Sequence, residues 1–255
     1  MRRIVSTCLL AACVVVSSVR AQPASSNSTN AALRYWMAFA VMKDPPADQS
    51  TAELLDRVAA GTASWDEAKL GKILDDNREA LDIMRRATTL AFCDWGLEFE
   101  LGPSTPIAHL AKARALGRLN GIAGTRLASR GQWADAVDVW LAGVRFSQHV
   151  ARQGTLISLL SARLSLSPSL KSLARAALQP SIDAARRQQI KAVVTAIPDG
   201  GFDWADAMRR EADVLVVARR QNPNVNAVMP SQARVDMTAN EIREERRALL
   251  AAVTK

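Results

Sequence analysis

Apolar residues recur at helical spacing along almost the whole chain, most clearly in residues 133–152. At 100° per residue, one face of this segment is apolar and a second apolar strip lies beside it, so only a narrow polar wedge remains. A helix that is apolar over most of its circumference is buried on several sides. The pattern therefore predicts a central helix over 133–152. The first apolar face consists of Trp133, Ala136, Val137, Trp140, Leu141 and Val144. The second apolar strip consists of Val139, Phe146 and Val150. The polar wedge consists of Asp135, Asp138, Arg145, His149 and Arg152.

Capping and breaking residues divide the remaining chain into further helices. Asn30 is placed to cap the first one, Gly61 and Gly131 to end later ones, and Pro168 to break another. Because no convincing pair of strands appears, the predicted fold class is all-α, with helical hairpins packed as an α-α superhelix or an irregular bundle and no substantial sheet. The predicted helices span 31–43, 78–90, 107–130, 133–152, 155–166, 169–178, 182–196, 202–221 and 238–253, and capping boxes at 50–53 and 64–67 open two more.

Residues 91–104 interrupt the helical pattern. Leu97-Glu98-Phe99-Glu100-Leu101 alternates strictly between apolar and acidic residues, which is the period of a strand. Without a partner strand, this stretch is predicted to be an extended loop with one wet and one buried face. Residues 30–255 are therefore expected to form a single all-helical domain with a loop break near 91–104.

The segment 107–130 is rich in glycine and alanine. Glycine in a helix interior costs about 1 kcal/mol relative to alanine. Several glycines in one helix therefore predict that neighbouring helices approach it closely.

The first 21 residues have the layout of a secretory signal peptide: a basic start, an apolar run, and Val19-Arg20-Ala21 before the expected cleavage. Residues 22–29 form a polar linker. The protein is thus predicted to be exported, either to the periplasm or into the medium. An alternative comes from Leu10-Ala11-Ala12-Cys13, which resembles a bacterial lipobox. Lipidation at Cys13 would anchor the protein to a membrane, and no other membrane association is expected.

Charge and cysteine content narrow the possible functions. The leader holds three of the 33 basic residues and no acid, so 30 basic residues face 25 acidic ones and the net charge after cleavage is +5. The basic residues form no concentrated basic face, so no nucleic-acid partner is predicted. Cys93 is the one cysteine beyond the leader, which excludes an internal disulfide. The six tryptophans are scattered and are interpreted as core residues rather than as a binding platform.

Two resemblances add to this interpretation. Gly124, Leu127, Gly131, Trp133, Ala136 and Trp140 resemble one tetratricopeptide helix pair, with Gly143 where that pattern prefers alanine and no second copy along the chain. In addition, the stretches 30–35, 93–96, 109–114 and 154–158 resemble a family of exported bacterial helical proteins that has no assigned activity. The resemblance implies the fold and no mechanism.

Known catalytic signatures are absent from the sequence, and neither a cofactor nor a metal is predicted. Cys93, His109 and His149 offer zinc-type ligands, but they are far apart and none forms an i, i+4 helical pair. The candidate binding residues are Asp94, Trp95, His109, Lys112, Arg145 and His149.

The leading functional hypothesis is an exported, helical-repeat-like binding or scaffold protein of the cell envelope that presents a groove to a protein or peptide partner. This hypothesis favours a non-catalytic role and leaves enzymatic activity open. The alternative is an enzyme or small-ligand-binding protein with a polar pocket around Asp94, His109, Arg145 and His149.

Overall fold

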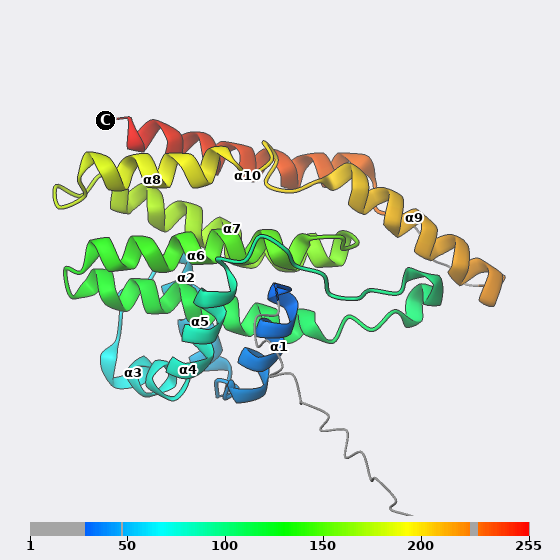
Figure 1. Ribbon diagram of the computed structural model, residues 1–255, viewed down its shortest axis with the longest axis horizontal. Coiled ribbons are helices and arrows are strands. Elements are labelled where there is room, and N and C mark those ends of the chain that lie inside the picture. Colours follow the sequence, from blue (N-terminus) through cyan, green and yellow to red (C-terminus); the bar gives the residue numbers. More distant parts are fainter. Residues whose placement is uncertain (1–28, 47, 225–228, 255) are drawn as a thin grey trace, which may run out of the picture.

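The computed structural model describes residues 29–46, 48–224 and 229–254, and these parts form an all-α fold, as the sequence predicts (Figure 1). The predicted leader and all but the last residue of the linker lie outside the described residues. The α-helices are α1 (Ala31–Val41), α2 (Gln49–Ala60), α3 (Glu67–Asp76), α4 (Arg78–Ala87), α5 (His109–Ser129), α6 (Trp133–Ala151), α7 (Leu156–Ala177), α8 (Ala184–Thr195), α9 (Trp204–Gln221) and α10 (Gln232–Val253), and a 3₁₀-helix, η1, spans Phe99–Ser104.

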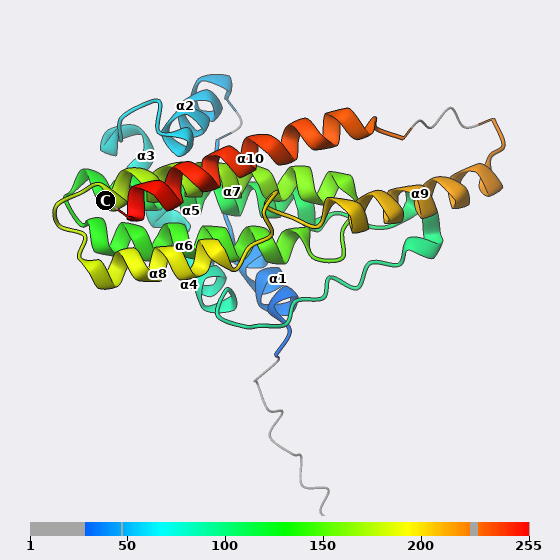
Figure 2. The ribbon, with the colours of Figure 1, turned by 90° about the horizontal axis from the view of Figure 1, so that it is seen from above.

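The three long helices α5, α6 and α7 form the central layer of the molecule (Figure 1). α8 and α10 lie along one side of this layer, and α1 to α4 lie along the opposite side. α9 extends away from the layer at one end (Figure 2). The central position predicted for residues 133–152 is confirmed, because α6 packs between α5 and α7 and buries most of its side chains.

Small residues let the three central helices approach closely, as the composition of 107–130 predicts. A methyl group at Gly117 would overlap the Ser165 side chain of α7, and one at Gly143 would crowd Ser169. A methyl group at Gly124 would overlap the indole ring of Trp140. These contacts join α5 to α6 and both helices to α7.

Several predicted helix boundaries are wrong. α7 continues through Pro168, where a break is predicted; its flanking residues Leu166 and Leu170 are fully buried, and α6 and α10 pack along it. Tertiary packing therefore compensates for the missing backbone hydrogen bond. α5 begins at His109 rather than at 107, because Thr105 turns its hydroxyl to the carbonyls of Glu98 and Gly102.

Aspartates cap α2, α3 and α8, in place of the serines that the sequence pattern indicates. The carboxylates of Asp48, Asp66 and Asp183 accept hydrogen bonds from the backbone N–H groups three residues further on. A carboxylate caps a helix and also stabilises the positive end of its dipole. Gly61 ends α2 with φ 73°, as predicted.

The interruption near 91–104 holds extended backbone followed by η1. Glu98 and Glu100 are exposed and Leu97 and Phe99 are half-buried, as the alternation predicts, but the prediction is wrong for Leu101, which is 41% exposed in η1. η1 packs against α9: Gly102 faces Val217, and the Arg210 guanidinium lies 5.6 Å from the centre of the Phe99 ring.

Gly124→Ala is expected to lower the free energy of unfolding by about 1–2 kcal/mol. Overpacking costs about 1–3 kcal/mol, and the gain in helix propensity of about 1 kcal/mol offsets part of that cost. Urea denaturation measures the difference. The matched control is Gly121→Ala in the same helix, where the nearest atom to the new methyl group lies 3.9 Å away on Ala59. A Gly124→Ala protein as stable as the Gly121→Ala control would contradict the close packing of Trp140.

Candidate functional site

Asn30 joins the beginning of α1 to the loop that carries Asp94. Its side-chain oxygen accepts hydrogen bonds from the N–H groups of Ala32 (3.1 Å) and Asp94 (2.9 Å), and its amide donates to the Asp94 carbonyl (2.9 Å). The Asp94 carboxylate itself accepts from the N–H of Gly96 at 2.9 Å. Asp94 thus shapes its own turn and holds the N-terminus of α1.

Trp95 is packed beneath α1 among other rings. Its indole stacks on His109 at a centroid distance of 4.3 Å and on Tyr35 and Phe39 of α1 at 5.7 and 6.2 Å. The indole N–H donates to the His149 carbonyl at 2.8 Å. The Trp95 side chain therefore connects four elements: the loop, α1, the start of α5 and the end of α6.

Tyr35 and His149 form a buried hydrogen bond between α1 and α6. The Tyr35 hydroxyl lies 2.7 Å from His149 Nδ1, and Tyr35 is fully buried. Burial raises the pKa of Tyr35 well above its ordinary value, with a smaller contribution from Cys93. Burial also lowers the pKa of His149 to about 4, assisted by the positive charge of Arg152. The His149 ring also donates a hydrogen bond to the Leu90 backbone, so its second nitrogen carries the proton, and Nδ1 accepts a hydrogen bond from the Tyr35 hydroxyl.

His109 lies on the other side of Trp95, at the beginning of α5. It is 2% exposed, and its ring meets the edge of Trp36 of α1 at a centroid distance of 6.5 Å. Burial lowers the pKa of His109 to about 4, so the ring is neutral at pH 7. Its Nε2 atom is buried and has no hydrogen-bond partner in the described part of the chain.

Lys112 and Arg145 complete the set of candidate residues. The Lys112 ammonium contacts both carboxylate oxygens of Asp44, just beyond the end of α1, at 2.8 and 2.9 Å. Arg145 is half-buried on α6 and makes no hydrogen bond or ion pair with another described residue.

Five of the six candidate residues thus contact α1 or the residues that flank it. Asp94 binds Asn30, Trp95 stacks on Tyr35 and Phe39, His109 packs on Trp36, Lys112 binds Asp44, and His149 binds Tyr35. No hydrogen bond or ion pair joins any two of the four residues proposed for a polar pocket, Asp94, His109, Arg145 and His149. Their contacts form a seat for α1.

The chemistry of this seat is that of a packed core. Its two imidazoles are neutral at pH 7, its phenol keeps its proton, and burial raises the pKa of the Cys93 thiol to about 12. A protonated buried thiol is a poor nucleophile. His149 also borders a surface hollow of about 460 Å³ beside Arg152, Asp203 and Asp206, but its Nδ1 atom is occupied by Tyr35.

The outer face of α1 is apolar and exposed. We define this α1 outer face as Leu33, Trp36, Met37, Ala40 and Val41, which recur at helical spacing opposite the buried Tyr35 side. Leu33 is 54% exposed and Met37 is 51% exposed. α1 lies at the periphery of the molecule in both views (Figures 1 and 2). A helix that is apolar all round is ordinarily covered on all sides, and the described part of the chain covers only one side of α1.

α7 carries a second exposed apolar strip. Ile157, Leu160 and Leu164 line a groove of about 480 Å³ together with Arg114 of α5. This groove is separate from the α1 outer face, because its walls come from α5 and α7.

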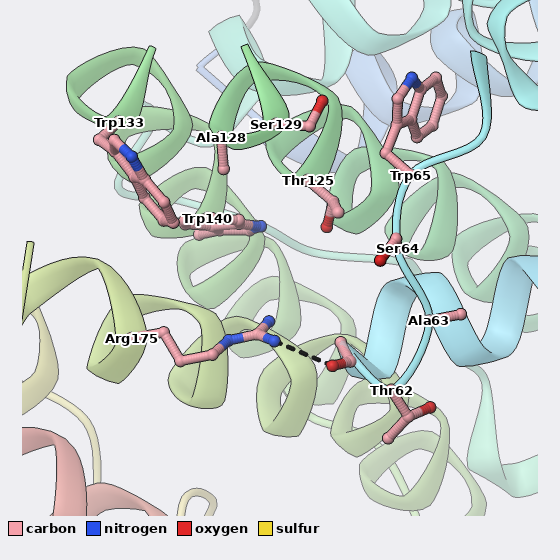
Figure 3. A pocket seen from close by; sticks show the side chains of 11 residues that line it. Thr62, Ala63, Ser64, Trp65, Thr125, Ala128, Ser129, Trp133, Trp140 and Arg175 are labelled. Atoms are coloured by element: carbon pink, nitrogen blue, oxygen red, sulfur yellow. Dashed lines mark hydrogen bonds between the residues drawn. The ribbon is translucent and has the colours of Figure 1, made fainter. Parts of the chain in front are cut away.

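A pocket of about 370 Å³ lies where the α2–α3 connection meets α5, α6 and α7 (Figure 3). Its lining includes Trp65, Trp133, Trp140 and Arg175. None of these four is among the binding residues predicted from the sequence. The scattered-tryptophan interpretation is correct for Trp140, which is 2% exposed and packed in the core, whereas Trp65 and Trp133 are only half-buried. Two glycines are the features of the sequence that relate most directly to this pocket. The absence of a side chain at Gly61 leaves room for Arg175, and its absence at Gly124 leaves room for Trp140.

Neither a metal-ligand cluster nor a membrane-spanning helix is found among the described residues. No group of three or more histidine, cysteine, aspartate or glutamate side chains is arranged to hold a metal ion. None of the helices there combines the length and the apolar character needed to cross a membrane.

Comparison with known proteins does not place the chain in a family. No family model, no curated protein and no solved structure matches it. The resemblances to a tetratricopeptide pair and to exported helical proteins accordingly stay predictions.

Tyr35→Phe is expected to lower the free energy of unfolding by about 1–3 kcal/mol, because it leaves His149 Nδ1 buried without its donor. Urea denaturation at pH 8 measures the loss, and the double variant Tyr35→Phe/His149→Phe separates the coupling of the pair from the two individual effects. Additive effects of the two substitutions would contradict the hydrogen bond.

The two histidines are expected to make stability fall in mild acid. Their folded pKa values of about 4 lie below the ordinary 6.5, so between these pH values the unfolded chain binds protons that the folded chain does not. Their contribution is complete above pH 6.5 and is lost as the pH falls through about 4. Urea denaturation at pH 7 and at pH 4.5 is expected to differ by on the order of 2 kcal/mol for each histidine.

The control for this pH dependence is His109→Phe, which keeps a ring on Trp95 and removes one titrating group. It is expected to halve the loss between pH 7 and 4.5. Carboxylates with lowered pKa, such as Asp199, lose their contribution at lower pH and do not obscure this window. A wild-type free energy of unfolding that stays constant between pH 7 and 4.5 would contradict the burial of neutral imidazoles.

Proposed function

We propose that this chain is an exported binding or scaffold protein that docks onto a partner protein through the α1 outer face. The observation that carries the proposal is a helix of 11 residues that is apolar on both sides, with one side seated in the core and the other exposed. Exposed contiguous apolar patches mark interaction sites.

The spacing of the exposed residues indicates how the partner would bind. Leu33, Trp36, Met37 and Val41 stand at positions i, i+3, i+4 and i+8, the spacing of a helix whose anchors insert into an apolar groove. We therefore assign the partner as a protein of another sequence that supplies such a groove. Trp36 is the expected central anchor, because tryptophan is enriched among the residues that dominate binding energy.

The size of the α1 outer face favours this assignment over a dimer. A stable interface of standard size takes about 20–30 residues from each partner, and the α1 outer face offers five. A groove that encloses a single helix buries the same five residues more completely.

The seat of α1 supports a binding role because it fixes the helix before the partner arrives. The Asn30–Asp94 hydrogen bonds hold α1 at its start, the Tyr35–His149 hydrogen bond holds its middle, and the Lys112–Asp44 ion pair holds the chain at its end. A helix ordered in advance loses less conformational entropy on binding.

The test begins with a photo-activated cross-linker at position 37 in the producing cell. The cross-linked partner is then purified, and its affinity for the purified chain is measured by calorimetry. Met37→Glu is expected to weaken binding by at least about tenfold, because it buries a charge in an apolar groove. The matched control is Met237→Glu on α10, where the methionine is 57% exposed and its replacement is expected to leave the affinity unchanged.

Other outcomes would overturn the proposal. Loss of binding with Leu164→Glu but not with Met37→Glu would place the interface in the α7 groove. Self-association abolished by Met37→Glu, measured by light scattering, would make the α1 outer face a dimer contact. Flotation with lipid vesicles that Met37→Glu abolishes would identify a membrane-binding face.

A further inference from the structure

The pocket between the α2–α3 connection and the ends of the central helices is built from aromatic walls and one cation. In Figure 3, Trp133 and Trp140 lie on one side, Trp65 stands across from them, and the Arg175 guanidinium reaches in from α7. Its volume of about 370 Å³ lies within the range of roughly 300–1,000 Å³ that small-ligand sites occupy.

The Arg175 guanidinium is held in place by neutral groups. It donates to the Gly61 carbonyl at 3.0 Å and to the Ser172 hydroxyl at 2.9 Å. No carboxylate of the described residues forms an ion pair with it. A guanidinium has five N–H donors, so most of them are available to a ligand while the two existing bonds fix its orientation.

The tryptophan walls are fixed as well. The Trp140 indole N–H donates to the Gly121 carbonyl at 3.2 Å, and the Trp65 indole N–H donates to Glu67 at 2.8 Å. The Arg126 guanidinium lies 5.7 Å from the centre of the Trp65 ring. Preformed walls of this kind favour a flat apolar group over a flexible polar one.

The charges around the pocket decide the charge of the ligand. Several aromatic rings alone would suit a quaternary ammonium group, but Arg175 would repel it. Glu67 contacts the wall residue Trp65, and Arg126 and Arg130 form ion pairs with it. The uncompensated charge in the pocket is therefore positive.

We propose that this pocket binds a small monocarboxylate that carries an aromatic ring, with the carboxylate on Arg175 and the ring between the tryptophans. The planar guanidinium matches a carboxylate with two parallel hydrogen bonds. This inference goes beyond the proposed function and does not depend on it, because the pocket lies at the C-terminal end of α5. The α1 seat uses the opposite end, roughly 20–30 Å away at 1.5 Å per residue.

The test uses three probes that share one ring and differ in charge: 3-phenylpropionate, 3-phenylpropionamide and 3-phenylpropylamine. Titration calorimetry on residues 22–255 is expected to show the carboxylate binding at least about tenfold more tightly than the amide, and the amine binding most weakly. Indole N–H resonances of the pocket tryptophans are expected to shift with the carboxylate, and that of Trp204 on α9 is not.

Two variants locate the binding to the pocket. Arg175→Gln is expected to reduce the affinity for the carboxylate by about tenfold, to the level of the amide. The matched control is Arg187→Gln, since Arg187 also donates to a backbone carbonyl, that of Ala177, but does not line the pocket. Trp133→Leu is expected to weaken the carboxylate and the amide alike.

Equal affinity for the three probes, tighter binding of the amine, or no binding at millimolar concentration would overturn the proposal. So would a carboxylate affinity that Arg175→Gln leaves unchanged. If Arg175→Gln fails to fold, the charge series and the indole resonances of the wild-type protein decide the question by themselves.

Discussion

The buried hydrogen bond between Tyr35 and His149 determines where the N-terminal helix lies, and the proposed interface depends on that position. α1 is short, and a helix of 11 residues is marginal in water without tertiary packing. Tyr35 joins it to α6, which packs against both α5 and α7 in the central layer, and Trp95 and His109 fill the space around that bond. The specific contacts of the inner face of α1 leave its outer face exposed, in the position that the proposed interface requires.

Burial explains why the two histidines serve structure rather than acid–base chemistry. A catalytic histidine works best with a pKa near the operating pH, whereas the pKa values of His109 and His149 are both about 4. The neutral His149 ring accepts from a phenol that itself keeps its proton. Neither residue therefore exchanges a proton near pH 7 in the folded protein.

The fold class and most of the helices could be predicted from the sequence, because they follow from local spacing. The α6 pattern is unambiguous, and Asn30, Gly61 and Gly131 act on residues beside them. The errors lie where contacts outside the local pattern determine the structure: α7 passes through Pro168 because α6 and α10 pack against it, and α5 begins at 109 rather than at 107 because Thr105 bonds to Glu98. Sequence periodicity contains no information about such partners.

The candidate residues show the same division. Trp95, His109 and His149 are predicted to be binding residues because of their chemistry. The structure brings them together, but their side chains pack beneath α1 and hold that helix. The role of Tyr35 as their common contact depends on a pairing across 114 residues, which local pattern does not encode. A binding role for Arg175 could not be predicted from the sequence for the same reason. The feature that distinguishes it from the other arginines is its position beside tryptophans from other segments.

The packing of the central layer makes the α1 outer face and the tryptophan pocket energetically independent. Gly117 and Gly143 bring α5 and α6 against α7 so closely that a methyl group has no room, and well-packed interiors resist small displacements. Coupling between distant sites requires an element with two discrete arrangements. The closely packed helices α5 and α6 contribute to both regions, and their packing leaves no room for a second arrangement. A ligand in the pocket is therefore expected to leave the position of α1 unchanged, so each proposed binding event would depend on its own local chemistry.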